Sequence, residues 1–312
     1  MSALLFPGQG SQVVGMGAEF YNNFDFVKKI YKEADQILGF PISKIILEGP
    51  SDELQMTKNT QPAILTVSYA IFQVLKNEFN YSISNFKCFA GHSLGEYSAL
   101  VCSDSLKFSD ALYLLHERGK AMQEAVPLGK GSMIAVLGSS INKINDLIKV
   151  AKVEDSCEIA NDNAVGQVIL SGKKESVEIF QSILKNEKIK FIPLRVSAPF
   201  HCSLMKPAAV SMSHKINKTE FSISKIDIIN NVTAKVEKNP DDIKRLLIDQ
   251  ISSTVRWRES ILNMFDMGVK NYIEIGPGKV LVGMVKRTLK DVNCFSINSI
   301  TDIKNLNDKI KR

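Results

Sequence analysis

The chain has 312 residues, of which 45% are hydrophobic and 23% charged, a composition typical of a folded globular protein and not of a disordered one. Its formal net charge of +6 suits acidic partners, but the lysines are spread along the chain without interleaved aromatic residues, so we expect no nucleic acid partner. Apolar stretches are short and interrupted by polar residues, so we expect no membrane span.

The number and spacing of the cysteines and histidines indicate the redox environment of the protein and whether it contains a metal site. The five cysteines are scattered, with no CxxC or metal-ligand spacing, which favours reduced thiols and a cytoplasmic location. The four histidines form no HExxH motif and no cluster with the cysteines, so we expect no metal site.

The two outer parts of the chain alternate short apolar runs with helical periods, which is typical of α/β construction. In the first part we expect strands at residues 4–6 and 87–90, and helices at residues 60–79, 96–102 and 110–126. After residue 201 we expect strands at residues 226–231 and 272–275, and helices at residues 241–250, 259–267 and 280–289, with a frayed helix in the lysine-rich C-terminal stretch.

The middle of the chain has a different order of elements. We expect strands at residues 132–138, 157–160, 167–171 and 190–196, with helices at residues 141–152 and 176–186. The order βαββαβ is that of a ferredoxin-like unit. We therefore predict an inserted domain at residues 128–196, and a larger domain formed by residues 1–127 and 197–312.

The sequence Gly91-His92-Ser93-Leu94-Gly95 lies between a predicted strand and a predicted helix. In a nucleophile elbow of this form, the glycines permit a sharp turn that presents the serine hydroxyl at a helix N-terminus. The N–H group that follows the serine can then donate to an oxyanion. A structural turn is the alternative, but the flanking elements favour a catalytic Ser93.

A serine nucleophile needs a base, and His201 is the histidine best placed to serve. It follows a predicted strand in an irregular, Pro-containing loop, and a structural histidine is the alternative interpretation. His92 directly precedes the serine, and His116 and His214 are expected at the surface. No acidic residue is apparent as the third member of a triad, so a backbone carbonyl or an amide is expected to orient the base.

Two glycine-containing loops, residues 6–12 and 276–279, lack the spacings of dinucleotide-binding and P-loop motifs. A strand-to-helix turn is the simplest interpretation of both, and we adopt it for residues 276–279. Arg118 lies on a predicted helix, and most helical arginines are solvated. Buried beside Ser93, however, it would select a substrate carboxylate through a bidentate pair.

Several motifs follow one another along nearly the whole chain: FPGQGSQ (6–12), NTQPA (59–63), GHSLGEYSAL (91–100), RGKAMQEAVP (118–127), GQVILSG (166–172), SAPFHCSLM (197–205), NNVTA (230–234), Gln250 and EIGPGKVL (274–281). In this order they resemble the malonyl-CoA:acyl carrier protein transacylases and the related acyltransferase domains of fatty-acid and polyketide synthases. One departure is Val165, where relatives often have proline, in a predicted turn of the insertion.

The resemblance implies an α/β-hydrolase-like large domain with an inserted ferredoxin-like (βαββαβ) domain. It also implies a ping-pong acyl transfer in which Ser93 is the nucleophile and His201 its base. The backbone carbonyl of Gln250 would orient the histidine, which accounts for the missing acidic residue. Arg118 would hold the substrate carboxylate, contrary to the interpretation of this residue taken alone.

Further site residues are implied by the same resemblance. The backbone N–H groups of Gln9 and Leu94 would form the oxyanion hole. The acyl pocket and its selectivity would involve Phe200, Gln61 and Met122. Leu94 after the nucleophile and Phe200 before the histidine match the malonyl-selective pattern, because a bulky Phe200 would crowd an α-methyl branch.

The implied activity is transfer of the malonyl group from malonyl-CoA to the phosphopantetheine thiol of acyl carrier protein, which supplies fatty acid elongation. Malonyl-CoA would be the substrate, acyl carrier protein the partner, and no cofactor would be bound permanently; we expect a monomer. Two other classes stay open. A serine esterase would share the elbow but normally place an acid between serine and histidine, and a non-catalytic scaffold would not require Ser93, His201 and Arg118 together.

Overall fold

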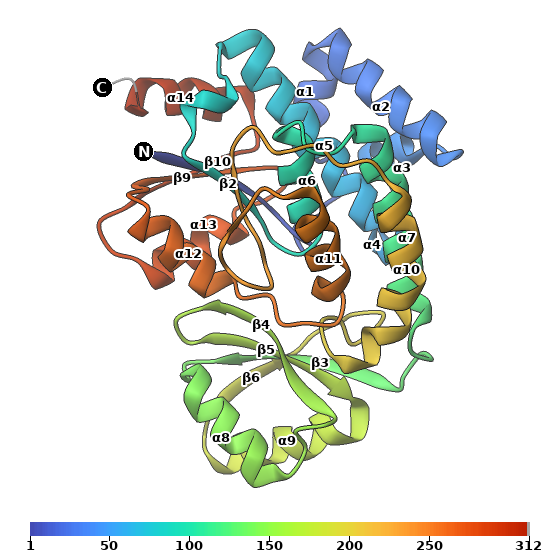
Figure 1. Ribbon diagram of the computed structural model, residues 1–312, viewed down its shortest axis with the longest axis vertical. Coiled ribbons are helices and arrows are strands. Elements are labelled where there is room, and N and C mark those ends of the chain that lie inside the picture. Colours follow the sequence, from blue (N-terminus) through green and yellow to red (C-terminus); the bar gives the residue numbers. More distant parts are fainter. Residues whose placement is uncertain (311–312) are drawn as a thin grey trace.

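The computed structural model describes residues 1–310 and contains two separate β-sheets (Figure 1). The larger sheet has six strands in the order β10-β9-β1-β2-β7-β8, and its neighbouring strands are parallel except for β7 and β8. Its strands are β1 (Ser2–Phe6), β2 (Cys88–Gly91), β7 (Asp227–Ile229), β8 (Val236–Glu237), β9 (Asn271–Ile275) and β10 (Asn293–Ile297). Parallel strands need long crossovers, which explains the alternation of strand and helix patterns in the sequence.

Strand β1 illustrates how both faces of the large sheet are covered. All five of its residues are buried, as expected for a central parallel strand. Side chains alternate between faces, so Leu4 and Phe6 pack into one hydrophobic core while Ala3 and Leu5 pack into another. Helices of the first core include α5 (Thr57–Phe79), α6 (Gly95–Cys102) and α7 (Phe108–Glu124), and those of the second are α12 (Trp257–Asp266) and α13 (Val280–Thr288).

The smaller sheet is antiparallel and has four strands in the order β4-β5-β3-β6. Its elements, in chain order, are β3 (Gly131–Leu137), α8 (Ile141–Ala151), β4 (Cys157–Ala164), β5 (Gln167–Lys173), α9 (Lys174–Asn186) and β6 (Lys190–Pro193). Ile134 and Val136 of β3 pack against the two helices, whereas Met133 and Ala135 belong to the first core of the large sheet. The free face of the small sheet is therefore directed at the rest of the molecule (Figure 1).

Strand β4 is attached directly to the segment that precedes α12. The N–H of Asp162 donates to the carbonyl of Val255 at 3.0 Å, and the N–H of Val255 donates to the carbonyl of Ala160 at 2.9 Å. The carboxylate of Asp162, which is buried, accepts hydrogen bonds from Arg258 at 2.9 and 3.0 Å. These bonds hold the end of β4 beside the large sheet.

Several elements were not predicted from the sequence. Residues 18–55 form α1 (Ala18–Asn23), α2 (Asp25–Leu38), α3 (Ile42–Glu48) and α4 (Ser51–Gln55), and later in the chain the same holds for α10 (Lys206–Lys218), β8 and β10. The helix expected in the lysine-rich C-terminal stretch is α14 (Ile300–Ile310). Helix α2 buries Val27, Ile30, Tyr31 and Ala34, a helical spacing that would have indicated it. Helices α1, α3 and α4 have five to seven residues and no side-chain N-cap bond, so they leave little pattern to recognise.

Helix α11 (Pro240–Gln250) ends at the residue expected to orient the base, and β4 extends to Ala164, four residues beyond its predicted end.

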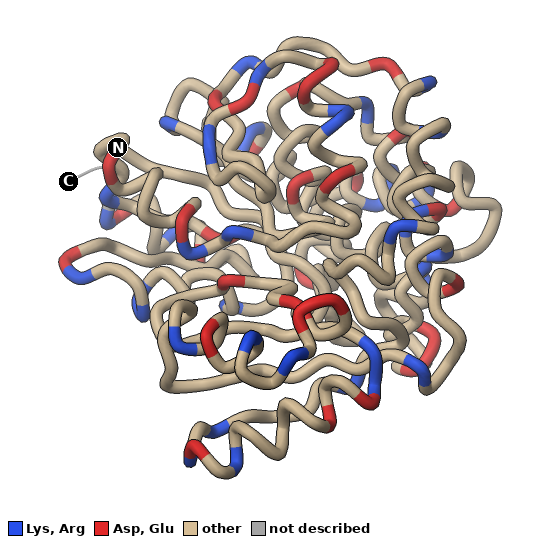
Figure 2. The backbone as a smooth tube through the Cα atoms, turned by 60° about the horizontal axis from the view of Figure 1, so that its bottom comes forward, with Lys and Arg blue, Asp and Glu red and all other residues tan. Residues whose placement is uncertain are grey.

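No helix among residues 1–310 combines the length and hydropathy that crossing a membrane requires. Lys and Arg are interspersed with Asp and Glu over the backbone, so the positive surplus is not gathered on one element (Figure 2).

Candidate active site

A sharp turn between β2 and α6 carries Ser93. Strand β2 ends at Gly91 and helix α6 begins at Gly95, so only three residues connect them. Ser93 has a backbone φ of 53°, in the left-handed region that residues other than glycine seldom adopt. Such a conformation costs about 1–3 kcal/mol and persists where the surroundings enforce it, most often at functional sites.

The two glycines of this turn allow its backbone to pack closely. A Cβ atom on Gly91 would lie 1.9 Å from the carbonyl carbon of Gly95, and one on Gly95 would lie 2.2 Å from the carbonyl oxygen of Phe6. Only glycine fits at both positions, because no side chain can approach backbone atoms so closely. The strand, turn and helix therefore form a nucleophile elbow.

Asn231 fixes the elbow from the end of β7. Its Oδ1 accepts a hydrogen bond from the N–H of Ser93 at 2.7 Å, and its Nδ2 donates to the carbonyl of Gly91 at 2.7 Å. The side chain is fully buried, so these bonds face little competition from water. Asn231 was not recognised as a site residue from the sequence, although it belongs to the NNVTA motif.

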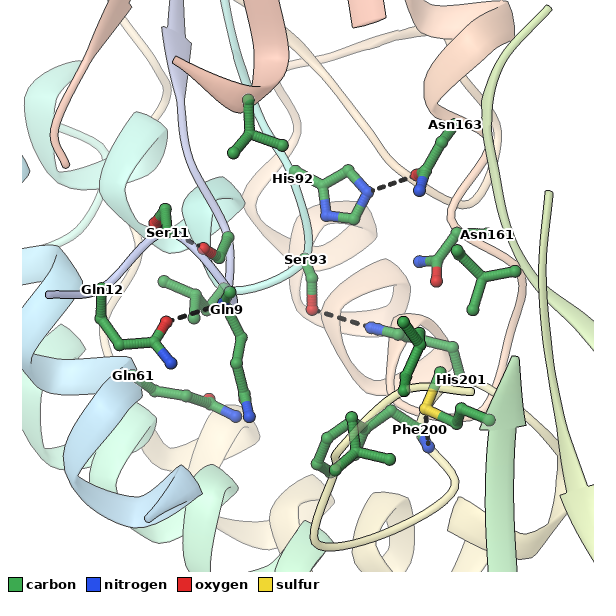
Figure 3. A pocket seen from close by; sticks show the side chains of 18 of the residues that line it. Gln9, Ser11, Gln12, Gln61, His92, Ser93, Asn161, Asn163, Phe200 and His201 are labelled. Carbon is green, nitrogen blue, oxygen red and sulfur yellow. Dashed lines mark hydrogen bonds between the residues drawn. The ribbon is translucent and has the colours of Figure 1, made fainter. Parts of the chain in front are cut away.

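His201 lies within hydrogen-bond distance of the serine. The distance between Ser93 Oγ and His201 Nε2 is 2.8 Å (Figure 3). His201 Nδ1 lies 2.8 Å from the carbonyl oxygen of Gln250. A carbonyl oxygen can only accept, so Nδ1 carries the hydrogen and Nε2 of the neutral ring accepts from the serine hydroxyl. The geometry thus prepares Ser93 to lose its proton to His201.

The surroundings of His201 keep its ring neutral. Burial, and secondarily the positive charge of Arg118, lower the pKa of His201 to about 3. A neutral imidazole is able to take a proton, so the ring is in its basic form throughout the physiological pH range.

Arg118 lies beside the serine, and its exposed fraction is 1%. Its Nη2 donates to Ser93 Oγ at 3.2 Å and to Gln250 Oε1 at 2.8 Å, while its Nη1 donates to Gln61 Oε1 at 2.8 Å. Interpreting this residue alone as a solvated helical arginine is therefore wrong. The reason is that α7 packs against α5 and α6 in the first core, which turns this face of the helix inward.

The guanidinium of Arg118 is a buried cation without a paired anion. Within residues 1–310 it lies in no ion pair, and its Nε has no hydrogen-bond acceptor. Burial lowers its pKa, which measures how strongly the site disfavours an isolated positive charge. A carboxylate that entered the site would relieve this cost through charge-assisted hydrogen bonds.

Two backbone N–H groups lie at the elbow without acceptors. Leu94, which is buried, follows the serine directly at the N-terminus of α6. The loop that contains Gln9 is pressed against the elbow, because a Cβ on Gly8 would lie 2.7 Å from the carbonyl oxygen of His92. Neither the Gln9 N–H nor the Leu94 N–H donates a hydrogen bond within the described residues.

The serine opens into a cleft of about 700 Å³ lined by residues from both sheets and their connections. Gln61 and Phe200, which were expected at the acyl pocket, line it (Figure 3), and so does Met122. Gln61 Nε2 lies 3.8 Å from Met122 Sδ, so these two side chains form one wall. The structure therefore brings all of the predicted site residues together around Ser93.

The small sheet contributes cleft residues that were not predicted. Asn161 and Asn163 line the cleft from the extended end of β4, and Asn163 Oδ1 lies 2.8 Å from His92 Nε2 (Figure 3).

The expected surface position is confirmed for His214, which is exposed. It is wrong for His116, which is half-buried with Nδ1 3.0 Å from the carbonyl of Lys58, because α7 packs closely along α5.

A serine on a nucleophile elbow, paired with a histidine that a main-chain carbonyl orients, defines the class of serine-dependent acyl-transfer enzymes. Residues 3–309 match the family described as acyl transferase domain. Among similar proteins, the malonyl CoA-acyl carrier protein transacylase of Bacillus subtilis is 42% identical over 298 residues, which span 95% of this chain and 93% of the relative. The chain therefore belongs to the acyl transferase domain family and, within it, to the malonyl CoA-acyl carrier protein transacylases.

Solved structures agree with this assignment. The acyl-carrier-protein S-malonyltransferase of Bartonella henselae superimposes with a TM-score of 0.96 at 37% identity, covering 100% of this chain and 99% of its own. A malonyl-transacylase in complex with its type II PKS acyl-carrier protein superimposes with a TM-score of 0.94 at 36% identity, covering 100% of this chain and 99% of its own. The family resemblance inferred from the motifs is thus confirmed.

We predict that Gly95→Ala lowers the free energy of unfolding by about 1–3 kcal/mol, because the added methyl group would meet main-chain atoms that cannot rotate away. Gly283→Ala in helix α13 is the matched control. Its added Cβ would enter open space, and helix propensity favours alanine there by up to about 1 kcal/mol. Chemical denaturation measures both changes, and a Gly95→Ala protein as stable as the control would contradict the close packing of the elbow.

Proposed function

We propose that the protein transfers the malonyl group from malonyl-CoA to the phosphopantetheine thiol of acyl carrier protein, through a malonyl ester on Ser93. The observation that carries this proposal is the unpaired, buried Arg118 with Nη2 3.2 Å from Ser93 Oγ. A malonyl thioester has a free carboxylate two carbons from the reacting carbonyl, and an arginine at this distance can hold it. The name of the Bacillus subtilis relative supports the same reaction.

In the first half-reaction, His201 Nε2 takes the proton of Ser93 Oγ as the oxygen attacks the thioester carbonyl carbon of malonyl-CoA. The negative charge that develops on the carbonyl oxygen is stabilised by the free N–H groups of Gln9 and Leu94. The C–S bond then breaks, and the CoA sulfur leaves with the proton that His201 returns. The malonyl group is now an ester of Ser93.

The second half-reaction runs through the same groups in reverse. The phosphopantetheine thiol of acyl carrier protein gives its proton to His201 and attacks the ester carbonyl carbon, again with the oxyanion at Gln9 and Leu94. The C–O bond breaks, and Ser93 Oγ recovers the proton from His201. The carbonyl of Gln250 holds the same tautomer of the histidine in both steps.

Selectivity is proposed to arise from one charge and one steric contact. Arg118 requires a carboxylate at the far end of the acyl group, whereas Phe200 limits the space beside the carbon that links the two carbonyl groups. Met122 and Gln61 complete the pocket. Exclusion of one additional methyl group is worth only about 1–3 kcal/mol, so the carboxylate contact is the stronger determinant.

We further propose that the fold is an α/β-hydrolase-like domain, residues 1–127 and 197–312, with a ferredoxin-like domain inserted at residues 128–196. The strand order β10-β9-β1-β2-β7-β8 and the elbow at the end of β2 support the first assignment. The βαββαβ order of elements between Gly131 and Pro193 supports the second.

The proposed partner is acyl carrier protein, supported by the similar complex with a type II PKS acyl-carrier protein. Malonyl-CoA is proposed as substrate without a permanently bound cofactor, and the malonyl product as the supply for fatty acid elongation. We infer a cytoplasmic location from the five free cysteines, and a monomer because one chain provides the whole site.

Incubation with malonyl-CoA followed by intact mass measurement tests the reaction. We expect a malonyl adduct on Ser93 that holo acyl carrier protein discharges quickly and water discharges slowly. Ser93→Ala removes the attacking oxygen and is expected to show no adduct. Rapid release of free malonate by the unaltered chain would instead identify an esterase, and absence of the adduct would identify a non-catalytic protein.

Arg118→Ala tests the role of the cation. We expect the kcat/KM of malonyl transfer to fall about 10- to 100-fold more than that of acetyl transfer, because only the malonyl group loses a charge-assisted hydrogen bond. Arg245→Ala on the outer surface of α11 is the control and should change neither rate. Equal losses for malonyl and acetyl groups in Arg118→Ala would exclude Arg118 from carboxylate binding.

A further inference from the structure

The buried carboxylate of Glu96, near the elbow, takes no direct part in the proposed acyl transfer. Glu96 lies in the first turn of α6, and its exposed fraction is 1%. Its Oε1 accepts from Asn230 Nδ2 at 2.6 Å, and its Oε2 accepts from Gln250 Nε2 at 2.8 Å and from the N–H of Asn231 at 3.1 Å. A single carboxylate thus joins the end of β7 to the end of α11.

Each of these contacts leads to a residue that holds the reacting groups. Asn231 bonds the N–H of Ser93, and the backbone carbonyl of Gln250 bonds His201 Nδ1. The backbone N–H of Glu96 donates to the carbonyl of Ser93 at 3.1 Å, but its carboxylate bonds neither Ser93 nor His201 in the described hydrogen-bond network. Its influence on the chemistry must therefore pass through its partners.

The side-chain amide of Gln250 connects Glu96 to the buried cation. Its Oε1 accepts from Arg118 Nη2 at 2.8 Å, while its Nε2 donates to Glu96 at 2.8 Å and to the carbonyl of Ser93 at 3.1 Å. If this amide turned over, its NH2 group would face the guanidinium, which has only donors. An ionised carboxylate, which has only acceptors, allows a single orientation of the amide.

We propose that Glu96 is a positioning residue for acyl transfer, which fixes Gln250 and thereby sets Arg118 and His201 around Ser93. This inference rests on the proposed function, since Arg118 matters most for a substrate that carries a carboxylate. Glu96 also carries the negative charge of this network, and the side-chain amide of Gln250 bonds both Glu96 and Arg118.

The ionisation of Glu96 provides a way to observe this role. Burial raises the pKa of Glu96 to about 7, against the lowering effect of its hydrogen bonds and of Arg118, the charged group that faces it from α7. The adjacent Tyr97 has a pKa raised to about 12 by burial, and the pKa of His201 is about 3. Near neutral pH, Glu96 is therefore the group in this network that changes charge.

Protonation would replace one acceptor of Glu96 with a donor and weaken its hydrogen bonds to the amide of Gln250, which Arg118 and the carbonyl of Ser93 would then hold without the charge of Glu96. We therefore expect the rate of Ser93 loading by malonyl-CoA to rise with pH through about pH 7, as Glu96 ionises. Loss of this pH dependence in Glu96→Gln would assign it to Glu96 and not to His201, whose pKa burial lowers.

The test is single-turnover loading by malonyl-CoA, followed by intact mass between about pH 5.5 and about pH 8.5. Glu96→Gln keeps the shape but fixes the uncharged state, and we expect loading at the upper end to fall on the order of 10- to 100-fold and to become independent of pH. Glu274→Gln is the matched control: Glu274 is also fully buried with a pKa raised to about 7, but it bonds the N–H of Val282, away from the elbow.

Several outcomes would overturn the inference. The first is a Glu96→Gln protein whose loading rate and pH profile equal those of the unaltered chain. The second is a Glu274→Gln protein whose loading rate, like that of Glu96→Gln, no longer rises with pH. Thermal unfolding of each variant establishes that it is folded; if Glu96→Gln does not fold, the profile of the unaltered chain decides, and a flat profile overturns the inference. An unaltered chain that forms no adduct at any pH overturns the proposed function itself, which separates the two failures.

Discussion

The left-handed backbone of Ser93 is the constraint on which the rest of the site depends. A φ of 53° at a serine is unfavourable on its own, and it is maintained by packing against β1 and by both ends of the Asn231 amide. The turn directs the hydroxyl into the cleft, and the N–H of the following residue, at a helix N-terminus, has no acceptor among residues 1–310. The glycines at either side are required because the backbone segments nearly touch.

Gln250 is the second centre of the site, and it acts with both its backbone and its side chain. Its carbonyl accepts from the base, and its amide bonds Arg118, Glu96 and the carbonyl of Ser93. A carboxylate in place of that carbonyl would raise the pKa of His201 and would compete with a substrate anion for Arg118. A neutral orienter therefore suits the role proposed for Arg118, which is to bind the carboxylate of the substrate.

The elbow could be predicted because its causes are local: two glycines, a strand before them and a helix after them. The order of elements between Gly131 and Pro193 was likewise visible as changes of hydrophobic period. The burial of Arg118 could not be derived in this way, since its partners Gln61 and Gln250 lie 57 and 132 positions away. A backbone carbonyl has no signature in any sequence, so the partner of His201 came only from the family resemblance.

The carbonyl that orients His201 also bears on which bonds this site can break. A carbonyl dipole stabilises a protonated imidazole less than a carboxylate does, so the ring holds a proton only briefly after taking it. An amine leaves only once it is protonated, whereas a thiol of pKa near 8.5 is a weakly basic leaving group that depends much less on the proton His201 returns. The same geometry is thus well matched to moving an acyl group between thiols and the serine hydroxyl, and poorly matched to cleaving amides.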